Sequence, residues 1–110
     1  MDVVLMKRVG MFFKLKPNAK EGYIKAHNEI WPEMRDVLNK SGIKNYSIWN
    51  VEDLLFAYYE IEDEKSMQKY LASSKTYGEW RNMMEKFVYI DPTTNIKEWP
   101  KEMVFFNQGK

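Results

Sequence analysis

The spacing of hydrophobic residues changes from one segment of the chain to the next. In residues 7–17, "KRVGMFFKLKP", every second residue is apolar, which predicts a β-strand that ends at the proline. In residues 19–40 the apolar residues recur at helical spacing, and Gly42 is typical of the end of a helix. Pro32 lies inside this predicted helix. Because proline has no amide hydrogen and crowds the preceding turn, we expect a kink or a break there.

The rest of the chain alternates between the patterns of strands and helices. Residues 44–50 and 53–62 have the composition of strands and flank a tight turn, which predicts a hairpin. The pattern then predicts a helix over 63–73 with Asp63 as its N-cap, a second helix over 75–90 and a last strand over 101–108. The order β-α-β-β-α-α-β is that of the α+β, ferredoxin-like split-βαβ fold. A length of 110 residues corresponds to a single domain, 1–110.

The second strand of the predicted hairpin is apolar on both of its faces. Leu55, Ala57, Tyr59 and Ile61 share one face, and Leu54, Phe56 and Tyr58 share the other. Helices packed on one side of a small sheet cover only one face, and an exposed apolar patch of this size is unusual in a monomer. We therefore expect a homodimer with C2 symmetry, in which two sheets pack against each other.

Composition and charge exclude several classes of function. Seventeen basic and sixteen acidic residues leave a net charge of +1, so nothing favours nucleic acid or an anionic membrane as a partner. The chain has no cysteine and one histidine, which excludes thiolate sites and a zinc site built from several histidines of one chain. No apolar run approaches the roughly 20 residues that span a bilayer, and the N-terminus lacks the features of a signal peptide. We expect a cytoplasmic protein that holds no metal.

The only histidine, His27, lies on the apolar face of the first predicted helix, and Tyr23 lies one turn before it on the same face. A histidine in such a position is more often a buried residue with a satisfied hydrogen bond than a catalytic group. The break expected at Pro32 favours an opening for a ligand beside it. From spacing alone, the sequence indicates a dimeric α+β domain with a candidate aromatic-lined pocket around His27.

Three stretches of the chain resemble the L-rhamnose mutarotase family. They are "KPNAKEGYIKAHNEIWPEM", "GIKNYSIW" and "LLFAYYEIE", and the order of elements is similar from about residue 7 to residue 107. The resemblance implies a dimeric α/β barrel and an enzyme that works without a cofactor. It also implies interconversion of the α and β anomers of a free 6-deoxyhexose, with L-rhamnose as the expected substrate.

Within this resemblance, the proton donor of the family corresponds to His27. Its sugar-contacting tyrosines correspond to Tyr23 and Tyr46, and a pair of aromatic positions corresponds to Trp80 and Arg81, where the family pattern has two tryptophans. An imidazole has an ordinary pKa near 6.5, so it can give and take the protons that opening a sugar ring requires near neutral pH.

Two other classes of function remain open at this point. Dimeric α/β barrels also include small monooxygenases, some of which degrade haem, and a fold does not specify a function. Such an enzyme would use His27 as a haem ligand or the tryptophans to hold an aromatic substrate. The second alternative is a sugar-binding domain that has no catalytic activity.

Overall fold

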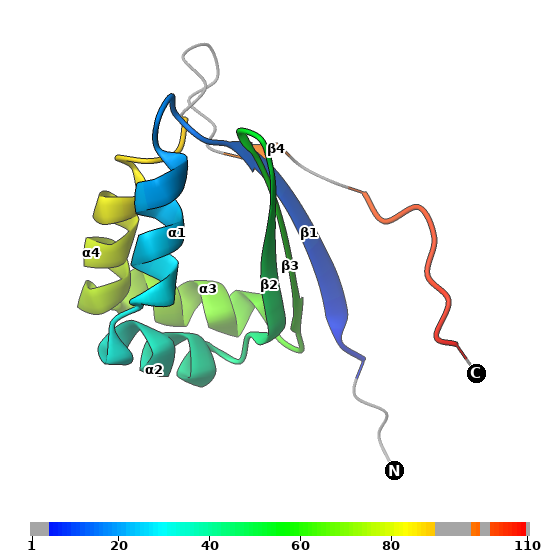
Figure 1. The fold of residues 1–110 in the computed structure, drawn as a ribbon. Helices are drawn as coiled ribbons and strands as arrows, with labels where there is room; N and C mark the ends of the chain where they lie inside the picture. Colours follow the sequence, from blue (N-terminus) through cyan, green and yellow to red (C-terminus); the bar gives the residue numbers. More distant parts are fainter. Residues whose placement is uncertain (1–4, 90–97, 100–101, 110) are drawn as a thin grey trace.

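In the computed structural model, which describes residues 5–89, 98–99 and 102–109, four helices cover one face of an antiparallel β-sheet (Figure 1). No helix of these residues lies on the opposite face of the sheet. Among the described residues there is also no helix long and apolar enough to cross a membrane.

The sheet consists of three long strands and one short one. Their bounds are Lys7–Lys14 (β1), Lys44–Val51 (β2), Leu54–Ile61 (β3) and Glu98–Trp99 (β4). They lie in the order β2-β3-β1-β4, and each neighbouring pair is antiparallel. This order confirms the ferredoxin-like arrangement that the sequence predicts.

Strand β3 lies at the centre of the fold and shows the predicted alternation. Leu55, Ala57, Tyr59 and Ile61 are buried under the helices, each with at most 9% of its surface exposed. On the other face Phe56 is 40% exposed, and its ring packs edge-on against Phe12 of β1. The helices therefore cover only one of the two apolar faces.

The segment predicted as one helix over 19–40 forms two helices. They are Lys20–Asn28 (α1) and Pro32–Ser41 (α2), with the break where Pro32 predicts it. Trp31 has the extended conformation (φ −60°, ψ 136°) that a following proline favours, and Pro32 occupies the first turn of α2, where no amide donor is needed. Gly42 ends α2 with a φ of 90°, a left-handed conformation that glycine adopts without steric cost.

The two remaining helices are Glu64–Ser73 (α3) and Lys75–Met84 (α4). The side chain of Asp63 accepts a hydrogen bond from the backbone amide of Ser66, which confirms it as the N-cap of α3. Ser74 caps α4 in the same way, because its hydroxyl oxygen accepts from the amide of Tyr77.

The prediction that α4 extends over 75–90 is wrong at its C-terminal end. The helix stops at Met84, and the chain then returns to the sheet, where Val88 forms a bridge with Leu15. The amide of Lys16 donates to the carbonyl of Phe87 at 2.8 Å. This pairing gives backbone groups hydrogen-bond partners and buries Val88. These two contributions to stability outweigh the helical pattern of the local sequence.

The prediction of a strand over 101–108 is also wrong for the residues described there. Residues 102–108 are in no strand, and the fourth strand lies earlier, at Glu98–Trp99, where it pairs with Phe12 and Phe13. A strand requires a partner for its backbone hydrogen bonds, and the residues that the structure describes offer none to residues 102–108. The polar loop predicted at 91–95 lies outside the described residues.

The interior divides into three separate clusters of buried residues. One is centred on Leu15 and Leu55, a second on Met34 and Trp80, and a third on Ile61. A small domain usually has a single contiguous core. Here partly buried residues join the clusters, with Met84 packed against the first and second and Leu71 against the second and third.

Two glycines in helices should respond differently to alanine. Gly78→Ala in α4 should raise the free energy of unfolding by about 0.5–1 kcal/mol, because glycine loses more conformational entropy on folding and nothing lies within 4 Å of the added Cβ. Gly22→Ala in α1 should give no such gain, because its Cβ would lie 2.7 Å from the ring of Phe87. Denaturant unfolding of both variants tests this, and equal stabilisation would contradict the close approach of Phe87 to α1.

Candidate active site

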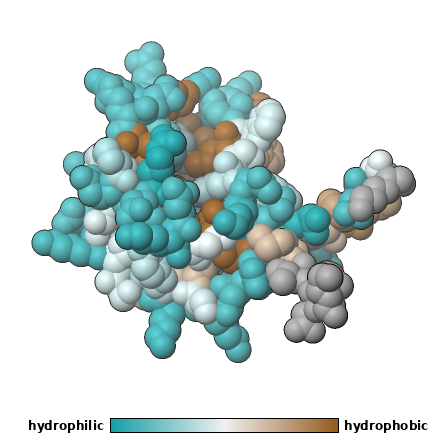
Figure 2. Space-filling view, turned by 90° about the horizontal axis from the view of Figure 1, so that it is seen from below, coloured by the Kyte–Doolittle hydropathy of each residue, from teal (hydrophilic) through white to brown (hydrophobic). Residues whose placement is uncertain are grey.

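A cavity of about 510 Å³ lies between the helical layer and the sheet. Residues of all three buried clusters line it, including Tyr23, Trp80 and Tyr59. Four methionines, Met11, Met34, Met67 and Met84, contribute to its apolar walls. In the space-filling view, hydrophobic side chains are set back behind a rim of hydrophilic ones (Figure 2).

All five residues predicted for the site line this cavity. They are His27, Tyr23, Tyr46, Trp80 and Arg81. They come from α1, β2 and α4, so segments that are far apart in the sequence converge here. A pocket of this size with an apolar wall and a few polar groups is typical of a small-molecule site.

His27 has a defined tautomer. Its Nδ1 lies 2.9 Å from the backbone carbonyl oxygen of Tyr23, one turn earlier in α1. A carbonyl can only accept a hydrogen bond, so Nδ1 carries the proton and donates it. In the neutral ring this leaves Nε2 with a lone pair that can accept a proton.

Two aromatic rings hold the imidazole of His27 in place. The ring centroid of Tyr23 lies 4.3 Å away, and that of Trp80 lies 5.3 Å away with the two rings nearly perpendicular. Burial disfavours the charged imidazolium and lowers the pKa of His27, while the hydrogen bond to the Tyr23 carbonyl opposes this shift. The neutral form therefore predominates at pH 7.

Tyr23 and Tyr46 place two phenol groups at the same cavity. Tyr23 is only 5% exposed, and its burial, followed by the proximity of Tyr46, raises its pKa well above the ordinary value. Tyr23 therefore keeps its hydroxyl proton and can donate a hydrogen bond. The ring of Tyr46 packs edge-on against Tyr59 with a centroid distance of 5.8 Å.

Trp80 and Arg81 differ in their burial. Trp80 is buried and packs edge-on against both His27 and Trp31, each at 5.3 Å. Arg81 is exposed at the rim, and its guanidinium carbon lies 5.8 Å from the ring centroid of Tyr77. Trp80 thus supports the histidine, and Arg81 offers donors at the edge of the cavity.

A second cavity of about 530 Å³ adjoins the first, and Tyr23, His27 and Tyr46 line both. Its lining is more polar. It includes four asparagines and one arginine, Asn28, Arg35, Asn39, Asn45 and Asn50.

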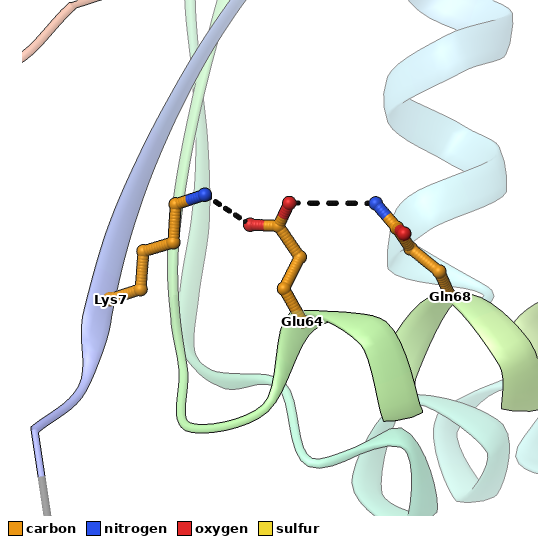
Figure 3. Close-up of polar contacts among 3 residues, drawn as sticks. All are labelled: Lys7, Glu64 and Gln68. Atoms are coloured by element: carbon orange, nitrogen blue, oxygen red, sulfur yellow. Dashed lines mark hydrogen bonds and ion pairs between the residues drawn. The ribbon is translucent and has the colours of Figure 1, made fainter.

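Three polar side chains in contact with one another join β1 to the α3 side of the first cavity. Lys7 of β1 forms an ion pair of 2.6 Å with Glu64 in the first turn of α3, and Glu64 accepts a hydrogen bond of 3.5 Å from Gln68 (Figure 3). Gln68 lines the cavity. The ion pair is partly exposed and contributes little stability, but it joins the end of β1 to α3 and restricts Gln68.

The part of the chain that the structure describes has no group of three or more histidine, cysteine or acidic side chains able to hold a metal ion. The polar groups of the two cavities are instead phenols, amides, one imidazole and two guanidinium groups. These groups are suited to hydrogen bonding and to proton transfer.

Comparison with known proteins agrees with this geometry. Residues 8–106 match the sequence model of the L-rhamnose mutarotase family. An L-rhamnose mutarotase of Listeria monocytogenes is 38% identical over 103 residues, which are 92% of this chain and 98% of that protein. The chain belongs to the L-rhamnose mutarotase family.

Other members of the family support the same assignment. An L-rhamnose mutarotase of Bacteroides thetaiotaomicron is 33% identical over 91% of this chain and 97% of its own. The crystal structure of an L-rhamnose mutarotase from Formosa agariphila has a TM-score of 0.77 at 26% identity, covering 93% of this chain and 99% of that one. The resemblance seen in the sequence is confirmed. The matches give no support to a monooxygenase or to a sugar-binding domain without activity.

Sequence reasoning missed the polar residues of the second cavity. Asparagines and an arginine on the exposed side of an element are ordinary surface residues by pattern, and no motif connects Arg35 and Asn39 with Asn45 and Asn50. It also missed Tyr59 as a cavity residue, although the alternation along β3 places it on the covered face.

The lowered pKa of His27 can be measured directly, because the chain has no other histidine. In an NMR titration of the folded protein, its imidazole signals should titrate below 6.5, the ordinary value, since burial favours the neutral ring. The ¹⁵N shifts of the neutral form should report a proton on Nδ1. A pKa at or above 6.5 would contradict the burial of the imidazole.

Proposed function

We propose that the protein is an isomerase that interconverts the α and β anomers of a free 6-deoxyhexose, with L-rhamnose as its substrate. The observation that carries this proposal is the state of His27. It is a neutral imidazole whose Nδ1 is occupied and whose Nε2 is left to accept a proton in a cavity of suitable size. The names of the related proteins support the choice of sugar.

Ring opening requires one proton to leave the anomeric oxygen O1 and one to reach the ring oxygen O5. Nε2 of His27 takes the proton from O1, the bond between C1 and O5 breaks, and the imidazolium returns the proton to O5. Both oxygens are bonded to C1, so one nitrogen that faces this carbon can serve both. After rotation about the bond between C1 and C2, the reverse steps close the ring on the other face of the aldehyde.

The neighbours of His27 assist this cycle without changing their own charge. Tyr23 keeps its proton, so its hydroxyl donates a hydrogen bond to a sugar oxygen and stabilises the charge that develops there. Trp80 restricts the imidazole ring. Tyr46 and Arg81 supply further hydrogen bonds to the hydroxyls of the sugar.

The apolar wall of the first cavity favours a deoxy sugar as the substrate. A 6-deoxyhexose has a methyl group in place of a hydroxymethyl group, and the methionine side chains offer it a surface that makes no hydrogen bonds. A hexose with a hydroxyl at this carbon would bury that hydroxyl without a partner, at a cost of roughly 1–3 kcal/mol. No cofactor takes part in this reaction scheme.

His27→Asn should keep the fold and lower the catalysed exchange of anomers about 10²-fold or more, the usual effect of losing an acid–base group. Saturation-transfer NMR of the anomeric protons of L-rhamnose measures this exchange. Tyr23→Phe should lower it less, because a hydrogen bond is lost but the proton carrier remains.

The matched control is Lys25→Asn, which places the same amide on the exposed side of the same helix. This variant should retain full activity. A folded His27→Asn protein with undiminished exchange would show that His27 is a core residue and would remove the basis of the mechanism.

We also propose that the protein is a homodimer in which two sheets pack against each other as a dimeric α/β barrel, and that it acts in the cytoplasm. The uncovered face of the sheet supports the dimer. On it Trp49 is 68% exposed, Val51 57% and Phe56 40%. Residues 103–106 add further exposed apolar side chains, and the ring of Phe106 lies 3.7 Å from the guanidinium carbon of Arg8.

Phe56→Lys should therefore dissociate the protein, because the charge would be buried without a partner between two apolar sheets. Light scattering at micromolar concentration should give twice 13.3 kDa for the parent protein and 13.3 kDa for the variant. The control Asn82→Lys places the same charge at an exposed position of α4, and this variant should remain a dimer. A monomeric parent protein would refute the sheet-on-sheet arrangement.

A further inference from the structure

We propose that the second cavity is a subsite for a second sugar unit. The enzyme would then also exchange the anomers at the reducing end of a disaccharide, with the reducing 6-deoxyhexose at His27 and the outer unit in the polar cavity. This inference rests on the proposed function. The same bond between C1 and O5 opens and closes, the same proton moves from O1 to O5, and the glycosidic bond is untouched.

The size of the site supports two units. The two cavities measure about 510 and 530 Å³ and meet at Tyr23, His27 and Tyr46. Pockets of roughly 300–1,000 Å³ hold whole drug-sized ligands. One pyranose whose C1 faces His27 in the first cavity therefore leaves the region lined by Arg35, Asn39 and Asn50 unfilled.

The chemistry of the second cavity is suited to a carbohydrate. A carboxamide has both donors and an acceptor, and either can bond to a sugar hydroxyl. Asn50 is already oriented, because its Nδ2 donates to the backbone carbonyls of Glu52 and Leu54, both at 2.9 Å. Its Oδ1 is left to accept.

An irregularity in the backbone of β2 lies beside this cavity, next to Tyr46. In a regular strand, neighbouring side chains point to opposite faces of the sheet. The register of β2 shifts between Lys44 and Ser47, and Asn45 has a φ of 51°. The ring of Tyr46 packs against Tyr59 on the covered face and lines the cavity, whereas the carboxamide of Asn45 bonds to Glu60 on the opposite face. Such bulges often re-aim side chains beside functional sites.

Arg35 indicates the nature of the outer unit. It lies one turn from Asn39 on the exposed side of α2, and in the described part of the chain it forms no ion pair. Among the described residues that line the second cavity, it is the only one with a fixed charge. A carboxylate on the outer unit would form charge-assisted hydrogen bonds with its guanidinium group, so a uronic acid is the favoured outer sugar.

Exchange NMR of anomeric protons tests the proposal with three kinds of substrate. These are L-rhamnose, neutral disaccharides with L-rhamnose at the reducing end, and the corresponding disaccharides with a uronic acid as the outer unit, linked through O2, O3 or O4. At least one uronic acid disaccharide should be accepted with a kcat/KM equal to or above that of L-rhamnose, and above that of its neutral counterpart.

Two variants separate the subsite from the catalytic centre. Arg35→Gln should lower kcat/KM for the acidic disaccharide about tenfold, the effect of losing one charged hydrogen bond, and Asn39→Ala should lower it for both disaccharides. Neither should change the exchange of L-rhamnose by more than about twofold, since their side chains lie outside the first cavity. The matched controls Lys69→Gln and Asn82→Ala, at exposed positions of α3 and α4 outside both cavities, should affect no substrate.

The outcomes distinguish this inference from the function on which it depends. If L-rhamnose exchange is catalysed while the anomers of every disaccharide exchange no faster than in buffer, the second subsite is refuted and the mutarotase activity stands. If Arg35→Gln lowers kcat/KM for L-rhamnose as much as for the acidic disaccharide, Arg35 belongs to the monosaccharide site and the subsite is again refuted. If no substrate is accelerated, both the subsite and the proposed function fail.

Discussion

The arrangement of the helical layer depends on the break at Pro32. A continuous helix over 19–40 would be a straight rod along the sheet. Because Trp31 is extended before the proline, α2 instead turns away from α1 and crosses one end of the space beside the sheet (Figure 1). His27 consequently lies in the last turn of α1, next to the break, and Arg35 and Asn39 approach the same region from α2. One backbone restriction thus positions both His27 and the polar side of the site.

The cavity and the hydrophobic core share some of their residues. Tyr23 and Trp80 are each buried in a core cluster and also line the cavity, so the walls of the site are parts of the core. The packing that stabilises the fold therefore also fixes the rings around His27, since side chains in a dense interior have few alternative rotamers. Apolar lining that stays accessible to solvent contributes less to stability than the same surface would in a filled core. A bound sugar would cover part of this lining.

Burial keeps the ionisable groups inside the site in their uncharged forms. Burial is the largest cause of both the lowered pKa of His27 and the raised pKa of Tyr23. Both shifts favour the uncharged form. A neutral site loses little hydration energy when a neutral sugar enters, and it can still pass a proton through the imidazole. Charge is confined to the edges, at Arg81 and Arg35, where solvent still reaches the guanidinium groups.

The sequence by itself determined the features that depend on neighbours along the chain. The alternation in β3, the break before Pro32, the cap at Asp63 and the shared face of Tyr23 and His27 are all local, and all are present in the structure. The tertiary structure alone decided where α4 ends and where the fourth strand forms, because a strand exists only beside a partner that supplies its hydrogen bonds. It alone also decided that polar residues of α1, α2 and β2 meet in one cavity. No local pattern records which distant backbones approach each other, and for that reason these residues look like ordinary surface positions in the sequence.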